Sequence, residues 1–328
     1  MLKKTCLSIL VVVIGLTYNT LFLLAKAYIN DEQHQKEKQQ VEQLVKKKDI
    51  NGLIQIVKEG ETRSKEIAAR WLGEFGDQTA IPILEEMNKV FATFICYESG
   101  EFAVAICKIK NKDKTNKDKI NALMGLAKGK ISSISSVSAI EISRFQDPVV
   151  LSVLPELRKL NGYGAVQAVI KLESFNLTQE EKIPKYIQIL KEHKNPMWAE
   201  GAENLLIEIG EPAVSKTVEL LISLDAGHTE TLRESFSITA TVMTRCITIL
   251  EKTGNNKCVL AIGERIYDHN LYVKSVATAA LQRITKEDFG FDYDDLRMEE
   301  AKFQKGLQGI TKAQEWWNNN KHRFEEKK

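Results

Sequence analysis

The sequence has no large excess of charge of one sign. It contains 46 lysine and arginine residues against 44 aspartate and glutamate residues, and the part after residue 27 contains 43 against 44. A protein that binds nucleic acid through a broad surface is strongly basic, because it must neutralise phosphates. The composition therefore gives no case for nucleic-acid binding. The hydrophobic share of 43% and the charged share of 27% are ordinary for a folded protein with a buried core.

Metal-binding and redox motifs are also missing. The five histidines are scattered along the chain, and none directly precedes a glutamate. No two cysteines have the Cys-x-x-Cys spacing of zinc ribbons, thioredoxin-like redox pairs and c-type haem sites. We therefore expect no cofactor and no metal ion.

The sequence lacks the signatures of common enzyme classes as well. It has no Gly-x-Ser-x-Gly nucleophile motif and no phosphate-binding loop. The tripeptide Asp288-Phe289-Gly290 occurs in kinases, but neither the glycine-rich loop nor the catalytic loop of a kinase accompanies it. We expect this tripeptide to form the turn after the last repeat helix. The chain is accordingly predicted not to be an enzyme.

The first 27 residues are typical of an export signal. Lys3 and Lys4 precede an apolar run, and Ala25-Lys26-Ala27 has the small residues of a cleavage site. Residues 7–25 are just long enough to cross a bilayer if they are retained. Two alternatives stay open: a signal peptide cleaved after Ala27, or an uncleaved anchor in the inner membrane. Both place the body outside the cytoplasm, in the periplasm or another extracytoplasmic space.

Residues 28–48 are polar on almost every side. Only Val41, Leu44 and Val45 form a short apolar stripe. A helix with so little apolar surface is expected to be solvated. We predict a polar helical stalk that joins the export segment to the body.

From residue 49 onward, hydrophobic residues recur with the period of an α-helix. Residues 64–84 set the pattern: Ala68, Leu72 and Phe75 share one face, Gly76 ends the helix, and Asp77 caps the next one. The pattern returns five times, and a larger gap leaves room for one poorly matched pair near 101–130. The counterparts of Ala68 and Leu72 are Ser138 and Ile142, Ala168 and Leu172, Ala202 and Leu206, Cys246 and Leu250, and Ala277 and Leu281.

This repetition predicts an all-α fold, an α-α superhelix or solenoid of stacked antiparallel helix pairs. A helix pair with one apolar side cannot bury that side alone, so successive pairs must stack on one another. The predicted solenoid covers residues 49–290. Residues 291–328 are expected to form C-terminal capping helices.

Two segments resemble HEAT repeats. AARWLGEFGDQTAIPIL at 68–84 is similar to the family pattern almost position by position, and AENLLIEIGEPAVSKTV at 202–218 is a second match. LQRITKEDFGFD at 281–292 and EWWNNNK at 315–321 are similar to the closing segment of some bacterial HEAT-repeat proteins. The chain thus resembles bacterial HEAT-repeat proteins of the PBS-lyase HEAT-like type. The resemblance implies a curved stack of helix pairs that binds other macromolecules, and it implies no reaction.

The cysteines of the predicted body allow two interpretations. Cys96, Cys107, Cys246 and Cys258 lie in a chain predicted to be exported, where disulfides form. Proximity in sequence suggests Cys96–Cys107 and Cys246–Cys258 as pairs. In an antiparallel helix pair, however, the two cysteines of each pair stand at different heights, which opposes the short distance a disulfide needs. The alternative is that they are small buried core residues.

A lysine-rich stretch covers residues 108–130. It includes Lys112, Lys114 and Lys117, with Asp113 and Asp118 between them and no aromatic side chain among the lysines. One interpretation is a solvated insertion between repeats. The other is a surface that contacts an acidic partner or lipid headgroups.

Trp316 and Trp317 lie in the predicted terminal helix. The last repeat of a solenoid needs a cap over its apolar end, and two tryptophans can provide it. Alternatively, they are aromatic anchors for a binding partner.

Two functions follow as hypotheses. The favoured one is an extracytoplasmic HEAT-like scaffold that mediates protein–protein interaction without catalysis. Its partner is a protein of unknown identity, and it meets the membrane only through an uncleaved N-terminal segment. The alternative is a lyase-like or cofactor-handling HEAT-repeat protein, which requires a pocket with convergent polar groups.

Overall fold

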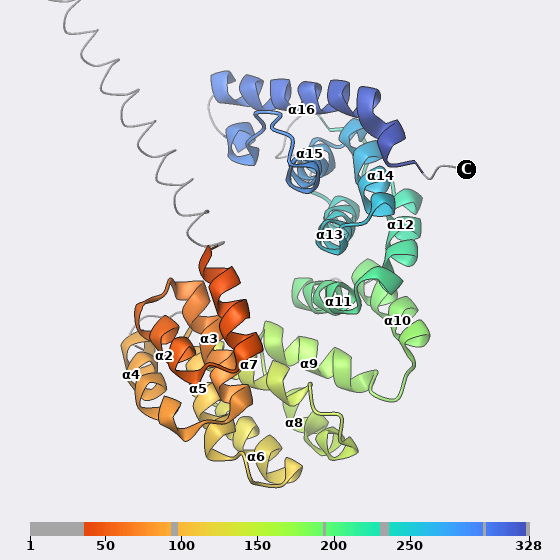
Figure 1. Ribbon diagram of the computed structural model, residues 1–328. Coiled ribbons are helices and arrows are strands. Elements are labelled where there is room, and N and C mark those ends of the chain that lie inside the picture. Colours follow the sequence, from red (N-terminus) through yellow and green to blue (C-terminus); the bar gives the residue numbers. More distant parts are fainter. Residues whose placement is uncertain (1–35, 93–97, 193–194, 230–235, 298–299, 326–328) are drawn as a thin grey trace, which may run out of the picture. The chain divides into compact units, whose positions relative to one another are not determined.

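The structure, a computed structural model, describes residues 36–92, 98–192, 195–229, 236–297 and 300–325 (Figure 1). These residues are almost entirely helical, and their only β-type pairing is an isolated bridge between Thr229 and Asn270. The predicted all-α, solenoid-like fold is confirmed. The chain divides into two compact units, Met1–Ser152 and Val153–Lys328, which we call unit 1 and unit 2 and describe separately.

Unit 1 consists of helix pairs whose first helices lie in a row. The helices α3, α5 and α7 are neighbours in this row, and α2, α4 and α6 pack against α3, α5 and α7 respectively. A helix over residues 36–47 precedes them. The bounds are α2 (Ile50–Glu59), α3 (Thr62–Phe75), η1 (Gln78–Ala80), α4 (Ile81–Ala92), α5 (Glu98–Lys110), α6 (Asn116–Ala127) and α7 (Ser132–Ile142).

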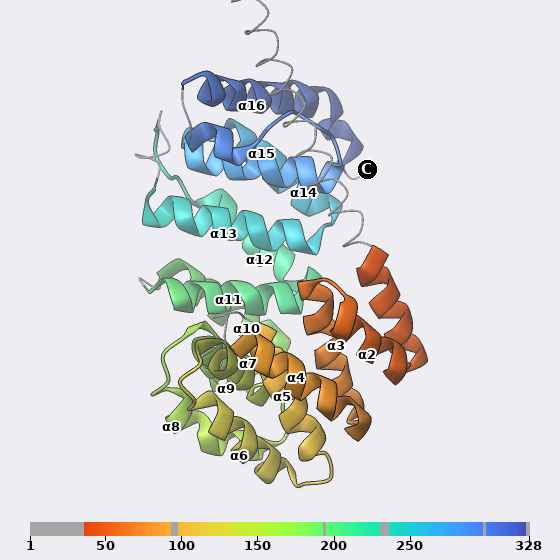
Figure 2. The same cartoon turned by 90° about the vertical axis from the view of Figure 1, so that its left-hand side faces the viewer.

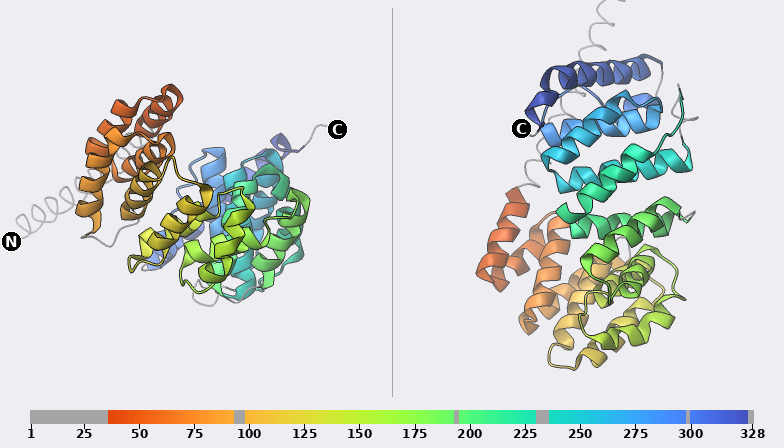
Figure 3. Two further views of the ribbon diagram at one scale, coloured as in Figure 1. Left: turned by 90° about the horizontal axis from the view of Figure 1, so that it is seen from below. Right: turned by 90° about the vertical axis from the view of Figure 1, so that its right-hand side faces the viewer.

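Unit 2 repeats the arrangement. Its first helices α9, α11, α13 and α15 follow one another in a row, and α10, α12 and α14 form a second layer beside it (Figures 1 and 2). Figure 3 shows the same layers from other sides. The bounds are α8 (Leu154–Leu157), α9 (Tyr163–Glu173), α10 (Gln179–Glu192), α11 (Pro196–Ile209), η3 (Glu211–Ala213), α12 (Val214–Ser223), α13 (Ile238–Thr253), α14 (Asn256–Glu264), η4 (Arg265–Tyr267), α15 (Leu271–Thr285), η5 (Tyr293–Arg297), α16 (Glu300–Asn320) and η6 (Lys321–Arg323), with η2 (Pro148–Val153) crossing the boundary between the units.

The repeat positions deduced from sequence lie in the core. Ala68 and Leu72 are both fully buried on α3, and each of their five counterpart pairs is at most 2% exposed on α7, α9, α11, α13 or α15. The predicted turn is also confirmed. Gly76 ends α3 in the left-handed conformation, with φ 66°, and the Asp77 side chain accepts a hydrogen bond from the Thr79 backbone N–H. These residues fix where one helix stops and the next begins.

The poorly matched pair near 101–130 is α5 with α6. Ala105 and Ile109 occupy the frame positions of Ala68 and Leu72, and both are buried. The turn after α5, however, has Lys112 and Asp113 where the first repeat has Phe75 and Gly76. The apolar face of this pair is therefore preserved, but the turn signature that reveals the other pairs is replaced by charged residues.

The predicted stalk is helical where it is described, but it is not a solvated spacer. Val41 is 1% exposed and belongs to the core of unit 1, with Leu44 and Val45 packed against the same cluster. The Glu37 carboxylate also accepts a hydrogen bond of 2.8 Å from the Glu61 backbone N–H. The short apolar stripe predicted a solvated helix, but it packs because it meets an existing apolar surface. This prediction is corrected: residues 36–47 are part of unit 1.

The predicted export segment lies outside the described residues. This applies to the signal peptide or anchor over 1–27, to the apolar residues 7–25 and to the cleavage site after Ala27. Among the residues that are described, no helix combines the length and the apolar character needed to span a bilayer.

Candidate functional site: a basic pocket in unit 1

The lysine-rich stretch is not an insertion between repeats. Residues 108–130 form the last turn of α5, the turn that follows it, α6 and the start of the next connection. The predicted exposure is correct for Lys112, Lys114 and Lys117, which all face solvent. These lysines are therefore held on ordered repeat structure.

A cavity of about 370 Å³ lies beside this turn. It is formed by the C-terminal ends of α3, α5 and α7 and by the first half of α6. Gly73, Cys107, Leu123 and Phe145 contribute uncharged surface. Its charged lining consists of Glu74, Lys108, Lys112, Lys119, Glu141 and Arg144. Four cationic and two anionic side chains give the pocket a positive charge, and we call it the basic pocket.

An ion-pair network neutralises one part of the pocket. Lys108 Nζ contacts carboxylates on both neighbouring helices, Glu74 of α3 and Glu141 of α7, the second at 2.5 Å. The second oxygen of Glu141 accepts from Arg144 at 2.8 Å. Burial alone raises the pKa of Glu141, but Lys108 and Arg144 outweigh it and lower the pKa below its usual range. Lys108 and Arg144 are thus already bound within the protein.

Two other lysines of the lining have no such partner. Within the described part of the chain, the side chains of Lys112 and Lys119 form no hydrogen bond and no ion pair. Lys112 acts on Asp77 only through space. The hydrogen bonds from Thr79 are the main reason that the pKa of Asp77 is lowered, burial opposes them, and the charge of Lys112 adds a small lowering. Gly76 makes room for the lysine, since a Cβ there would stand 2.6 Å from Lys112 Cδ.

A second depression adjoins the basic pocket. It has a volume of about 540 Å³ and shares Glu74, Gly76 and Lys112 with it, while Lys48 and Asp77 form part of the other wall. Lys112 therefore stands between two hollows. A ligand longer than one residue can contact both of them across this side chain.

Cys107 lines the basic pocket as a free, half-buried thiol. Burial raises the pKa of this thiol, and a weak hydrogen bond of 3.7 Å from Asn111 Nδ2 only partly opposes the effect. The thiolate is the reactive form of cysteine. Cys107 is thus held in its unreactive, protonated form near neutral pH.

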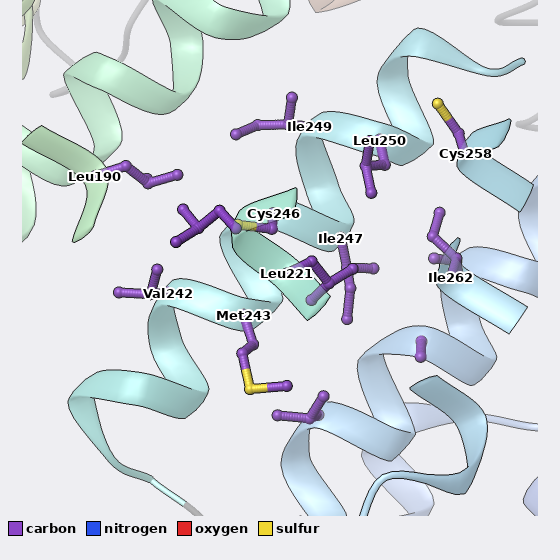
Figure 4. Close-up of a cluster of buried hydrophobic side chains, with 14 of the residues drawn as sticks. Leu190, Leu221, Val242, Met243, Cys246, Ile247, Ile249, Leu250, Cys258 and Ile262 are labelled. Carbon is purple, nitrogen blue, oxygen red and sulfur yellow. The ribbon is translucent and has the colours of Figure 1, made fainter. Parts of the chain in front are cut away.

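The other predicted cysteine positions are core residues. Cys246 and Cys258 are both free thiols with no exposed surface, packed among aliphatic side chains of unit 2 (Figure 4). Burial raises the pKa of Cys246 to about 12. The pairing of Cys246 with Cys258 is therefore not formed, and the core interpretation is confirmed for these two. Cys96 lies outside the described residues.

The two tryptophans close the end of unit 2. Trp317 has no exposed surface, packs on Gly263 of α14 and donates a hydrogen bond of 3.2 Å to Glu264. Trp316 is half-buried between Phe289 and Phe324. Both side chains lie where a cap over the last repeat is expected. Trp317 has no exposed surface to offer a partner.

The rest of the described chain offers little for chemistry. Its histidine, cysteine, aspartate and glutamate side chains form no group of three or more suited to a metal ion. The Asp288-Phe289-Gly290 tripeptide is a turn after α15, as predicted, with the Asp288 carboxylate accepting from the Gly290 backbone N–H at 2.7 Å.

Comparison with known proteins found no family model and no curated protein that matches the chain. The HEAT-like resemblance therefore stays a prediction that rests on the sequence segments that suggested it.

Sequence analysis found Lys112 but not the rest of the pocket. Glu74, Glu141 and Arg144 lie on helices far apart in sequence, and only the stacking brings them together. A signal for them existed in the repeat frame. Lys108 and Glu141 each follow the small buried residue of their helix by three positions, so they meet when α5 and α7 align.

Proposed function

We propose that this chain is an extracytoplasmic helical-repeat scaffold that binds another protein and catalyses no reaction. The observation that supports it most is the basic pocket, where Lys112 and Lys119 face a concave surface without internal partners. Stacked helix pairs present such surfaces on a rigid frame, which is how solenoids bind other macromolecules. Export is supported by the apolar and basic residues before position 28.

The alternative of a lyase-like, cofactor-handling protein requires convergent polar groups, and the basic pocket has them. The ion pairs and the protonation of these polar groups favour binding over catalysis. Lys108 and Arg144 are held by Glu74 and Glu141, and burial keeps the Cys107 thiol protonated. A nucleophilic cysteine reacts as its thiolate, and burial raises the pKa of the Cys107 thiol and so opposes that form.

Site-specific photocrosslinking in living cells tests the proposal. A photoreactive amino acid at Lys114, on the exposed rim near the pocket, is compared with one at Ser215, an exposed position of α12 in unit 2. We expect a discrete crosslinked protein from position 114 and none from position 215. Absence of a crosslink at 114, or the same products from both positions, contradicts the proposal.

The export part of the proposal has a separate test. N-terminal sequencing of the chain isolated from envelope fractions is expected to show either a start at Tyr28 or an intact leader in the membrane. Recovery of the full chain in the cytoplasmic fraction would contradict export.

A further inference from the structure

One short segment of unit 1 is rich in lysine. Residues 108–119 contain six lysines against Asp113 and Asp118. Lys110 is paired with Glu85 at 2.7 Å, and Lys108 is held by its two carboxylates. The remaining four form no ion pair within the described ranges; they are Lys112, Lys114, Lys117 and Lys119. Unpaired charges of one sign gathered in a concave place attract a ligand of the opposite sign and raise its local concentration.

The basic pocket separates these four lysines into two matched pairs. Lys112 and Lys119 belong to its lining, whereas Lys114 and Lys117 do not. Lys119 is half-buried at the start of α6, and the exposed Lys112 passes close to Gly76. The two lining lysines therefore stand beside the cavity. The two outer lysines carry the same charge away from it.

We propose that the basic pocket binds an acidic peptide segment, whose carboxylates are received by Lys112 and Lys119. This rests on the proposed function, because the segment belongs to the protein that the scaffold binds. Phe145 offers an apolar surface beside the cations, and the adjoining depression continues on the far side of Lys112. Carboxylates of the segment enter the basic pocket, and its uncharged residues continue into the adjoining depression, where Glu74 and Asp77 balance Lys48 and Lys112.

The carboxylates of the lining favour a singly charged ligand group over a doubly charged one. Glu141 is nearly buried and Glu74 is exposed, and both pair with Lys108. Each of them repels an anion in the pocket, and this repulsion is larger for a doubly charged phosphate than for a singly charged carboxylate. A membrane surface is flat and does not enter a concave pocket.

The test measures binding of a short fluorescein-labelled oligoglutamate peptide to the purified full-length chain by fluorescence anisotropy. Three proteins are compared: the wild type, the pocket variant K112E/K119E and the matched rim variant K114E/K117E, which changes the same charge. Circular dichroism confirms that both variants fold like the wild type. An oligoglutamine peptide of equal length serves as the neutral probe.

We expect the pocket variant to weaken binding by about tenfold or more and the rim variant by less than about threefold, because only Lys112 and Lys119 line the cavity and charges farther from the ligand are screened by solvent and salt. Equal losses in both variants, or no binding of oligoglutamate by the wild type, overturn the proposal.

Other anions provide the competing outcome. Inorganic phosphate, phosphatidylglycerol vesicles and a single-stranded oligonucleotide are titrated in the same way. If one of them binds more tightly than oligoglutamate and depends on Lys112 and Lys119, the acidic-peptide assignment is wrong. A crosslinked partner in cells without peptide binding leaves the scaffold function standing and refutes only this assignment, whereas peptide binding without any crosslinked partner refutes the function.

Discussion

At the scale of single residues, the structure distinguishes side chains that hold the fold from those available to a partner. Trp317, a candidate for both roles, is fully buried, while Lys112 and Lys119 face a cavity without a partner among the described residues. What separates the two groups is whether the side chain is buried and whether its charge is paired, and neither property can be read from the sequence. A buried side chain contributes to stability, and an unpaired charge at a concave surface contributes to binding.

Replacing Trp317 with alanine is expected to lower the free energy of unfolding by about 3–5 kcal/mol, because it empties a fully packed site. Chemical denaturation followed by circular dichroism measures the change. Trp71→Ala is the matched control, since Trp71 is 38% exposed and its loss should cost less than about 2 kcal/mol. Equal effects of the two substitutions would contradict the capping role.

Glu141 is expected to make stability depend on pH. Its pKa is lowered in the folded state, because the opposing effect of burial is outweighed by Lys108 and Arg144. A carboxyl with a lowered pKa stabilises the fold above its ordinary pKa, near 4.5, and loses that contribution as the pH falls through the folded-state value. The advantage of the wild type over Glu141→Gln should therefore be largest at neutral pH and shrink below about pH 4.5 in denaturation experiments.

Glu203 provides the contrasting control for that experiment. Burial raises its pKa more than Arg245 lowers it, so the folded-state value lies above the ordinary one. The same linkage then has the opposite sign, and its contribution is present at low pH and lost as the pH rises through the folded-state pKa. Relative to Glu203→Gln, the wild type should lose stability with rising pH. If the stability difference from the wild type changes with pH in the same direction for Glu141→Gln and Glu203→Gln, the opposite pKa shifts assigned to the two glutamates are wrong.

At the scale of helices, close approach and charge set how neighbouring first helices align. In unit 2, Lys171 of α9 meets Glu208 of α11 at 2.5 Å, and Arg283 of α15 meets Glu251 of α13 at 2.6 Å. Exposed ion pairs contribute little stability each. Their recurrence between successive first helices instead favours one register of the stack, as Lys108 does between α3 and α7.

Gly73 tests the close approach of α3 and α5. A Cβ at this position would lie 2.9 Å from the Cα of Ala105, a backbone atom that cannot move aside alone. Gly73→Ala is therefore expected to destabilise unit 1 by about 1–3 kcal/mol in denaturation experiments.

Gly125→Ala is the control for Gly73. Gly125 lies inside α6, and an added Cβ there meets nothing within 4 Å. Alanine favours the helix over glycine, so this variant should be more stable by roughly 0.5–1 kcal/mol. Stabilisation by both substitutions would show that α3 and α5 are not packed as closely as the structure places them.

At the scale of the whole molecule, the sequence predicts the fold better than the site. The Ala68 and Leu72 positions recur because every first helix must bury the same face, so their counterparts could be found by pattern. The helix pair that contains Ala105 did not match the repeat pattern, because Lys112 and Asp113 stand where the other pairs have their turn residues. The basic pocket could not be predicted, because its lining comes from four helices that only the folded chain brings together. The packing of Val41 depends on a surface supplied by later residues, which local composition does not describe.

The most direct test of the whole account is the affinity of the partner protein captured by crosslinking at Lys114. Its binding to the full-length chain is measured by calorimetry for the wild type, K112E/K119E and K114E/K117E. We predict that the dissociation constant rises by about tenfold or more in the pocket variant and by less than about threefold in the rim variant. An unchanged affinity in the pocket variant would contradict the claim that this chain is a scaffold that binds through its basic pocket.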